Sequence, residues 1–385
     1  MSTRQHRILV VDDEPDIEHL VLQRMRREIR RGDYIFEFAG NGVEALERLS
    51  KRDDVDMVVS DINMPHMDGL TLLEQIPKVD PSVKSVIVSA YGDMKNIRTA
   101  MNRGAFDFVT KPIDFEDLRV TIDRTLEHLE MLREALASRD KLVAIQHELG
   151  VASQMQQSIL PKVFPKTDHL SLHASMTPAR DVGGDFYDFV PLTDGKIGMT
   201  IADVSDKGVP AALFMMSSRT MLKGSAIGLS EPQEVLAEVN DLLETDNTTA
   251  MFVTVLYAVY DPRSGELTYA SGGHDPPIVV RSDGTVEVQP NTGGIALGIA
   301  PGFKFSQNTV QLQPGDRVAM FTDGVTEAAR ADEEQFGLTR LQETLAAIGA
   351  GDAEDLTAAV LDAVHEFVSD APQSDDITFL SFCRH

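Results

Sequence analysis

Residues 113–149 contain neither proline nor glycine, the two residues that most often end a helix. Pro112 and Gly150 flank this stretch, and Pro161 and Pro165 follow it. We therefore predict one long helix that ends before Pro161. The helix separates two segments, and a length of 385 residues also favours two domains over a single core.

Apolar residues recur along this helix at alternating four- and three-residue steps, the spacing of a coiled-coil seam. A first run comprises Leu118, Ile122, Thr125, Leu129, Leu132 and Leu136; after Arg139 a second run, displaced by one position, comprises Leu142, Ile145, Leu149, Ala152 and Ile159. Such a phase break locally changes the supercoil. We interpret residues 114–160 as a linker that forms a homodimer. The alternative is an ordinary amphipathic helix packed on its own domain.

Before the linker, short β-branched runs alternate with helical patterns such as Ile17–Ile29 and Val43–Leu49. The runs predicted as strands are Ile8–Val11, Tyr34–Ala39, Val55–Ser60, Ser85–Ser89 and Phe106–Val109. This alternation predicts an α/β domain over residues 1–125, with a doubly wound, five-stranded parallel sheet. Its ligand site should lie at the carboxyl ends of the strands.

Polar residues follow the predicted strands at those ends. Asp12 and Asp13 follow the first strand, Asp61 the third and Lys111 the fifth, while Ser89 ends the fourth. Three converging carboxylates require a hard cation such as Mg²⁺, and an aspartate beside Mg²⁺ can accept a phosphoryl group. We expect Lys111 to neutralise phosphoryl charge and Ser89 to donate a hydrogen bond to it. Pro112 is predicted to follow a cis peptide bond.

The runs VVDDE, DINMPHMDG, VSA and TKP resemble the receiver domain of two-component response regulators over about residues 6–125. The resemblance implies that Asp61 is the phosphoacceptor. It implies a Mg²⁺ site formed by Asp12, Asp13, Asp61 and the Asn63 backbone carbonyl, and it makes Phe108 the switch aromatic. A cognate histidine kinase is the implied partner.

Residues 161–385 alternate strands and turns, with hairpin signals at 261–265 and 282–284. The predicted strands are Gly195–Ala202, Ala250–Tyr260, Gly265–Ala270, Ile278–Arg281, Arg317–Phe321 and Asp376–Phe382. The predicted helices are Pro210–Ser225, Pro232–Thr245, Leu338–Ile348 and Glu354–Val368. We expect a mostly antiparallel α+β domain with its helices outside the sheet.

Four carboxylate motifs stand out in this second segment: GGDFYD at 183–188, DVSDKG at 203–208, TDGVTE at 322–327 and SDDIT at 374–378. Glycines beside the aspartates allow a close approach of the backbone to a ligand. Oxygen-only ligands suit Mg²⁺ or Mn²⁺, and two such ions can clamp a phosphate and activate a water. The motifs thus indicate metal-dependent phosphate hydrolysis.

In this order the motifs resemble the SpoIIE/RsbU-type branch of the PPM metal-dependent phosphatases, over about residues 150–385. QQSILP at 156–161, PAR at 178–180, PAA at 210–212, MFVT at 251–254 and GHDPP at 273–277 add to the match. The resemblance implies an αββα fold with two metals. The implied ligands are Asp185 and Asp203 as bridges, the Val204 carbonyl, Asp323 and Asp375, with Asp376 as a neighbour whose register is ambiguous.

This sequence departs from the family pattern at two places. Asp206 stands where the family usually has glycine, which adds a charge at the metal site or distorts its loop. Gly273-His274-Asp275 replaces part of the usual Ala-Gly-His-Asn run, and His274 is either a structural or a functional histidine.

Net charge, hydropathy and cysteine content indicate which partners and which cellular location to expect. A net charge of −26 disfavours nucleic acid, and no apolar run is long enough to span a membrane. The N-terminus lacks the pattern of a secretory signal, and a single cysteine, Cys383, fits a cytoplasmic protein.

The interpretation that follows is a dimeric response regulator in which phosphorylation of Asp61 controls a phosphoserine/phosphothreonine phosphatase. The family resemblance implies a phosphorylated STAS-type anti-sigma-factor antagonist as substrate. The alternative is a non-catalytic adaptor whose phosphatase-like domain binds a sigma factor or its regulator.

Overall fold

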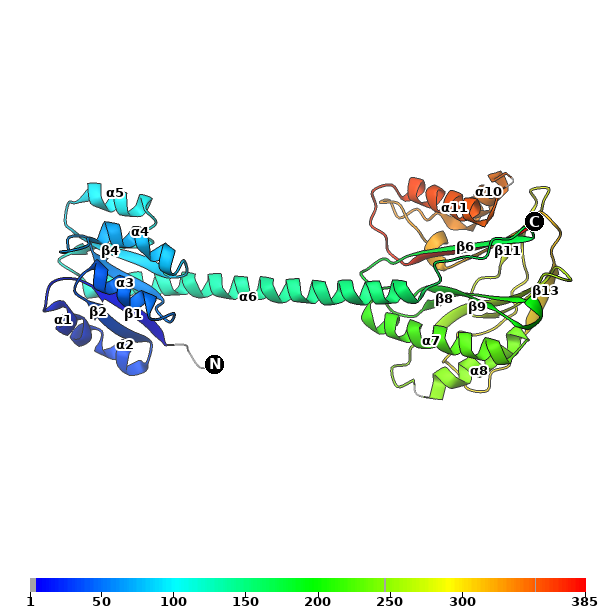
Figure 1. Ribbon diagram of the computed structural model, residues 1–385, viewed down its shortest axis with the longest axis horizontal. Helices are drawn as coiled ribbons and strands as arrows, with labels where there is room; N and C mark the ends of the chain where they lie inside the picture. The colour runs from blue at the N-terminus through cyan, green and yellow to red at the C-terminus, as the bar shows by residue number, and fades with distance from the viewer. Residues whose placement is uncertain (1–4, 246, 350) are drawn as a thin grey trace. The chain divides into compact units, whose positions relative to one another are not determined.

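The computed structural model describes residues 5–245, 247–349 and 351–385. The chain divides into two compact units within one long helix, between Ala144 and Ile145 (Figure 1). None of the helices in these ranges combines the length and apolar character that crossing a membrane requires.

The first unit is built on a parallel sheet with strand order β2-β1-β3-β4-β5. The strands are β1 (His6–Val11), β2 (Tyr34–Ala39), β3 (Met57–Asp61), β4 (Lys84–Ala90) and β5 (Asp107–Lys111). Every neighbouring pair is parallel. The predicted doubly wound sheet is confirmed.

Helices cover both faces of this sheet, as a parallel sheet requires. They are α1 (Ile17–Arg24), α2 (Arg26–Arg31), α3 (Gly42–Ser50), α4 (Gly69–Val79) and α5 (Met94–Asn102). Val21 of α1 and Ile122 of the long helix α6 pack on one face, and Leu49 of α3 and Leu72 of α4 pack on the other. The helix predicted over Ile17–Ile29 is instead two helices that meet at Met25.

Helix α6 runs without interruption from Phe115 to Ile159, which confirms the predicted linker helix. Its first turns belong to the first unit, because Leu118, Ile122, Thr125 and Leu129 are buried there. These four positions of the predicted seam therefore face their own sheet, not a second helix. The exposed part of the seam begins at Leu132, which is 41% exposed, and continues through Leu136 to Leu142, which is 62% exposed.

The second unit contains two antiparallel five-stranded sheets, with orders β13-β10-β9-β8-β7 and β12-β11-β14-β15-β6. The first sheet comprises β7 (Phe186–Pro191), β8 (Ile197–Val204), β9 (Val253–Asp261), β10 (Glu266–Gly272) and β13 (Gln307–Gln311). The second comprises β6 (Leu170–Thr177), β11 (Ile278–Val280), β12 (Val286–Val288), β14 (Arg317–Phe321) and β15 (Ile377–Arg384). A single 3₁₀ turn, Thr193–Gly195, precedes β8.

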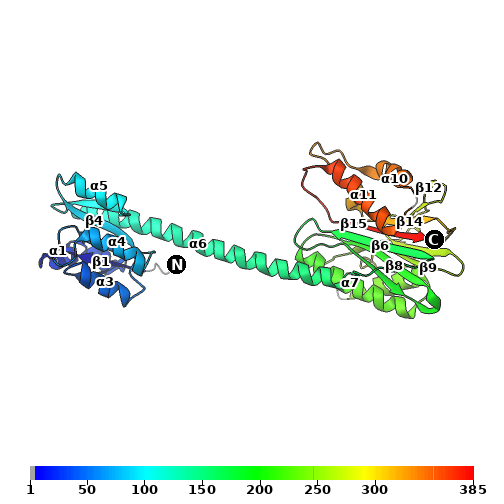
Figure 2. The same ribbon diagram turned by 45° about the horizontal axis from the view of Figure 1, so that its top comes forward.

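Helices lie outside both sheets (Figure 2). Helices α7 (Val209–Gly228) and α8 (Pro232–Thr245) cover the first sheet, and α9 (Asp323–Thr326), α10 (Gly337–Ala347) and α11 (Ala353–Val368) lie on the side of the second. Between the sheets, the rings of Tyr260 and Phe382 lie 4.5 Å apart, centroid to centroid. The arrangement is the expected αββα sandwich.

The strands β6, β7, β12 and β13 were not among the predicted elements. In β6 a signal was present, because Leu170, Leu172, Ala174 and Met176 alternate with polar residues. Strand β7 begins inside GGDFYD, a motif that was predicted to be a metal-binding loop because of its two aspartates.

Candidate functional site

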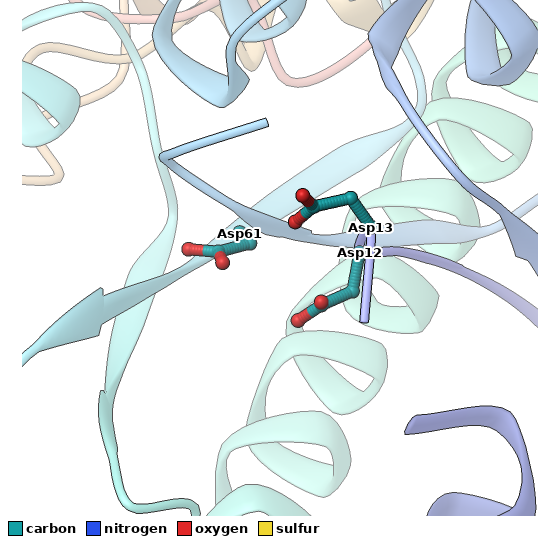
Figure 3. A group of neighbouring side chains, drawn as sticks. All are labelled: Asp12, Asp13 and Asp61. Carbon is teal, nitrogen blue, oxygen red and sulfur yellow. The ribbon is translucent and has the colours of Figure 1, made fainter. Parts of the chain in front are cut away.

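Three carboxylates gather at the carboxyl edge of the first unit's sheet (Figure 3). Asp12 and Asp13 follow β1, Asp61 ends β3, and one oxygen of each lies within 4.8 Å of the others. Burial raises the pKa of Asp12, although hydrogen bonds from the Glu14 amide and from Lys111 oppose the rise. Such crowding of negative charge is what a bound divalent cation relieves.

Lys111, the last residue of β5, points into this carboxylate group. Its Nζ lies 2.7 Å from Asp61 Oδ2, 3.1 Å from Asp12 Oδ2 and 2.8 Å from Glu14 Oε1. Burial lowers the pKa of Lys111, but hydrogen bonds to Asp61, Glu14 and Asp12 outweigh it and hold that pKa above its usual value. The Lys111–Pro112 peptide bond is cis, as predicted. Glu14 was not predicted, although it directly follows the two aspartates.

Ser89 supplies a hydroxyl group beside this edge. It is 1% exposed, and its Oγ has no hydrogen-bond partner among the described residues. A buried donor without a partner is unusual in a folded protein, and it is what an incoming oxygen ligand would satisfy. The Asn63 amide lies 3.4 Å from Asp61 Oδ1, and Phe108 on β5 is 36% exposed. The roles of the Asn63 carbonyl and of Phe108 stay predictions.

The second unit brings its four carboxylate motifs to one edge of the sandwich. Asp185 precedes β7 and Asp203 lies at the end of β8; Asp323 follows β14, and Asp375 and Asp376 precede β15. The strand ends meet because β7 pairs with β8, and β14 with β15, in antiparallel fashion. Gly324 permits a close approach of the loops: a Cβ at Gly324 would lie 1.9 Å from the Asp376 carbonyl oxygen.

Asp185 is the most buried of these carboxylates. Its Oδ2 accepts hydrogen bonds from Thr322 Oγ1 at 2.7 Å and from Thr378 Oγ1 at 2.6 Å. Burial, together with the neighbouring charge of Asp203, raises the pKa of Asp185 well above its usual value. Both threonines lie within the carboxylate motifs TDGVTE and SDDIT, but only the aspartates of these motifs were predicted to belong to the site.

The remaining carboxylates also perturb one another. Burial and the charge of Asp323 raise the pKa of Asp203 to about 7. Burial and the charge of Asp375 raise the pKa of Asp323. The negative charge of each carboxylate therefore raises the pKa of a neighbouring one, and together the carboxylates form a single region of strong negative potential.

Asp375 and Asp376 differ in what their oxygens contact. Asp376 accepts hydrogen bonds from the amides of Ala179 at 2.7 Å and Gly184 at 2.6 Å, so both of its oxygens are engaged by the loop before Asp185. Asp375 is half-buried; its Oδ1 accepts from the Asp376 amide at 2.9 Å, and its Oδ2 is 3.0 Å from Lys207 Nζ. Lys207 was not predicted to take part in the site.

The Val204 carbonyl faces the same loop, since a Cβ at Gly184 would lie 2.9 Å from that oxygen. The carboxylate oxygens of the second unit's site are spaced more widely than those of Asp12, Asp13 and Asp61 in the first unit. Among the described residues, only Asp12, Asp13 and Asp61 form a set of three or more ligating side chains with mutual separations within 4.8 Å.

Asp206 adopts a left-handed backbone conformation, with φ of 68°. Such a conformation favours glycine, and aspartate is among the few other residues that tolerate it. A glycine would adopt this conformation without strain, and the aspartate adds a carboxylate to the loop that follows Asp203.

His274 is a structural histidine. Its Nε2 lies 3.0 Å from the Phe321 carbonyl, which can only accept, so Nε2 carries the proton and Nδ1 accepts from Thr254 Oγ1 at 3.0 Å. Burial lowers the pKa of His274 to about 4, so the ring is neutral. The two hydrogen bonds of His274 thus connect Thr254 of β9 to Phe321, the last residue of β14. Phe321 lies two residues before Asp323.

Two family models match the chain: one described as response regulator receiver domain matches residues 8–123, and one described as Stage II sporulation protein E (SpoIIE) matches residues 193–385. Protein IcfG of Synechocystis sp. is 32% identical over 269 residues, 62% of this chain and 42% of IcfG. Phosphoserine phosphatase RsbU of Bacillus subtilis is 30% identical over 244 residues, 62% of this chain and 71% of RsbU. The solved SiaA-PP2C domain of Pseudomonas aeruginosa covers 64% of this chain and 98% of its own, with 25% identity and a TM-score of 0.56.

The fold and the two acidic sites define a receiver domain joined to a PP2C-type serine/threonine phosphatase domain. The chain belongs to the SpoIIE family. It spans less than half the length of IcfG and 71% of that of RsbU.

Proposed function

We propose that this protein is a response regulator whose output is Mg²⁺- or Mn²⁺-dependent dephosphorylation of phosphoserine or phosphothreonine in a partner protein. The observation that carries the proposal is the convergence of Asp185, Asp203, Asp323 and Asp375 at one edge of a PP2C-type sandwich, with the pKa of the first three raised by burial and by one another. Buried carboxylates that raise one another's pKa need a compensating cation to stay charged.

The oxygen-only donor set fits two hard divalent ions. Asp185, Asp203 and the Val204 carbonyl would hold the two ions, and Asp323 and Asp375 would hold one of them. Because both oxygens of Asp376 are engaged by backbone amides, we assign it to holding the loop. When bound, such ions clamp a phosphate and supply an activated water.

The chain's own side chains orient the carboxylates and supply positive charge. Thr322 and Thr378 fix the rotamer of Asp185 by donating to one of its oxygens. Arg180 is exposed, and its Nη1 lies 3.9 Å from where a Cβ on Gly208 would be, so it lies beside the loop that follows Asp203. We assign Arg180 to binding the substrate phosphate, a dianion for which a guanidinium group is well suited.

The family resemblance points to a STAS-type anti-sigma-factor antagonist as the phosphorylated substrate. The similarity to RsbU, which is named a phosphoserine phosphatase, supports a phosphoserine or phosphothreonine protein. The test is phosphate release from a phosphorylated STAS-type protein by the full chain, with Mn²⁺ or Mg²⁺ and with a chelator. Release that depends on the metal is expected. No release under any metal condition, with binding of a sigma factor or its regulator retained, would replace the enzyme by the adaptor.

In the receiver domain we assign Asp61 as phosphoacceptor, with Mg²⁺ held by Asp12, Asp13, Asp61 and the Asn63 carbonyl. The compact carboxylates fit the ion, while Lys111 and the unpartnered Ser89 hydroxyl suit phosphoryl oxygens. The donor in the cell would be a histidine kinase. Asp61→Asn should abolish labelling by acetyl phosphate, whereas Asp53→Asn, at an exposed position of the same domain, should label normally.

The exposed seam of α6 is assigned to a second copy of this chain. Leu132, Leu136, Leu142 and Ile145 are all more than 40% exposed on a helix that carries them at coiled-coil spacing. A parallel pair of such helices would bury them and give a homodimer. We place the protein in the cytoplasm, where its single cysteine, the buried Cys383, stays reduced.

A further inference from the structure

Gln156 makes an unusual contact near the end of α6. Its side-chain Nε2 donates to the Gly183 carbonyl at 2.6 Å, and its Oε1 accepts from the Gly183 amide at 3.1 Å. One side-chain amide thus satisfies both backbone groups of one loop residue. Gln156 is only 4% exposed, and Gly183 is buried as well, so water cannot take the place of either bond.

Gly183 lies between this amide and a carboxylate of the acidic site. A Cβ at Gly183 would lie 2.4 Å from Asp376 Oδ2, so only glycine fits. On that side Asp376 accepts from the amides of Gly184 at 2.6 Å and Asp185 at 3.3 Å. The loop that carries Asp185 is therefore held from two directions, by Asp376 and by the linker helix.

We propose that Gln156 is a positioning residue of the phosphatase site, through which the seating of the last turns of α6 sets the placement of Asp185. The proposal rests on the proposed phosphatase function and names the contact by which the linker would regulate it. A helix turns by about 100° and rises by about 1.5 Å per residue, so a small rotation or slide of α6 breaks both bonds at once. The Gly183 backbone would then be left buried without partners, and the loop would have to move.

The neighbouring residue provides a matched control. Gln157 has the same side chain on the same turn, but it is exposed. In the full chain we would compare Gln156→Leu, which removes both hydrogen-bonding groups at similar size, with Gln156→Glu, which keeps the acceptor and loses the donor. Gln157→Leu controls for the loss of a polar side chain from the helix.

Three measurements separate positioning from a loss of folding. They are deuterium exchange in the peptide spanning residues 179–185, direct Mn²⁺ binding, and the Mn²⁺ dependence of phosphate release. For Gln156→Leu we expect faster exchange in that peptide and a Mn²⁺ affinity of the phosphatase site weakened by about 10-fold or more, the usual effect of losing a group that orients a metal ligand. Gln156→Glu should fall between Gln156→Leu and the wild type, and Gln157→Leu should match the wild type.

The outcomes distinguish this proposal from the proposed function. If Gln156→Leu binds Mn²⁺ as the wild type does, or if its losses merely follow a lower thermal midpoint and appear equally in peptides far from Gly183, the positioning role is wrong. If Gln156→Leu does not fold, Gln156→Glu decides by the same measurements. If exchange and Mn²⁺ binding change as expected but not even the wild type releases phosphate, the positioning role stands and the proposed enzyme fails.

Discussion

Lys207 Nζ lies 3.0 Å from Asp375 Oδ2 and donates to the Ser374 carbonyl at 2.6 Å. This contact joins the loop after β8 to the loop before β15, and it places an ammonium group on a carboxylate assigned to metal binding. Both side chains are about one third exposed, at 35% and 31%, so solvent screens part of their attraction.

The contact predicts that Lys207 competes with the metal. Lys207→Met should strengthen Mn²⁺ binding severalfold, on the order of 1 kcal/mol, because a positive charge leaves the neighbourhood of a cation site. Mn²⁺ titration of the full chain measures this. Lys196→Met is the control, since that lysine is equally exposed and pairs with Asp261 elsewhere in the same domain. Weaker binding in Lys207→Met would mean that the lysine supports the site.

Removing an assigned ligand should have a much larger effect. Asp203→Ala and Asp323→Ala are each expected to reduce phosphate release by several kcal/mol of transition-state stabilisation, about 100-fold or more. Neither change should unfold the protein, because both remove a carboxylate that burial and like charge already penalise. Circular dichroism checks the fold, and Asp370→Ala, at an exposed position, serves as control. Normal turnover in both variants would refute the metal assignment.

The sequence predicted the outline of both sites because their residues are fixed by strand ends. Asp12, Asp61 and Lys111 each follow a β-branched run, and a parallel sheet brings such ends together. What it missed are groups that act through partners distant in sequence. Glu14, Lys207 and Thr322 become part of a site only through contacts across loops, and Gln156 only because Gly183 lies against it.

For the linker, the sequence predicted a contact that the structure does not show. The apolar spacing from Leu118 to Leu129 fits a coiled coil, yet these residues pack on the receiver sheet. A helix that covers a sheet and a helix that pairs with another helix both need an apolar stripe, so periodicity alone does not identify the partner. The stripe is exposed from Leu132 to Ile145, whereas Ile159 at its far end packs against the core of the second unit.

The left-handed conformation of Asp206 gives a prediction about stability. A non-glycine residue at φ of 68° carries a conformational cost that glycine avoids. Asp206→Gly should therefore be more stable to urea than Asp206→Ala by about 1 kcal/mol, with the wild type between or near them, because aspartate tolerates this region better than alanine. Equal stability of the glycine and alanine variants would show that the loop relaxes to another conformation.

The buried His274 predicts a pH dependence. The pKa of this ring is lowered from 6.5 to about 4 in the folded protein, so below pH 6.5 the unfolded chain takes up a proton that the folded chain refuses. The stability due to this group is complete above about pH 6.5, and it is lost as the pH falls toward 4, by about 3 kcal/mol.

The measurement is urea unfolding of wild type and His274→Gln across that range. The wild type should be more stable at pH 7, and the difference should shrink toward pH 4. His147→Gln, at an exposed position of α6, should show no such change in its difference from the wild type. If the difference in unfolding free energy stays constant or grows toward pH 4, the folded protein protonates His274 as readily as the unfolded chain does, and the lowered pKa is wrong.

The last prediction concerns how the two domains communicate. Residues 134–148 of α6 are all exposed, so an insertion after Arg139 disturbs neither the receiver core nor the contact of Gln156 with Gly183. In a coiled coil of 3.5 residues per turn, seven inserted residues complete two turns, whereas four overshoot one turn by about 50°.

If phosphorylation of Asp61 acts by changing how paired α6 helices pack, the phase of the seam must matter. A signal can select one packing only through a difference in free energy between two of them. The four-residue insertion should keep basal, metal-dependent activity and the dimer, but should lose the change in activity that acetyl phosphate causes. The seven-residue insertion should restore that change at least in part. Light scattering reports the dimer, and Asp61→Asn in each background separates the response to the donor from basal activity. A monomer in both receiver states, or equal behaviour of the two insertions, would exclude control through helix phase, because the seam would then have no partner or its register no effect.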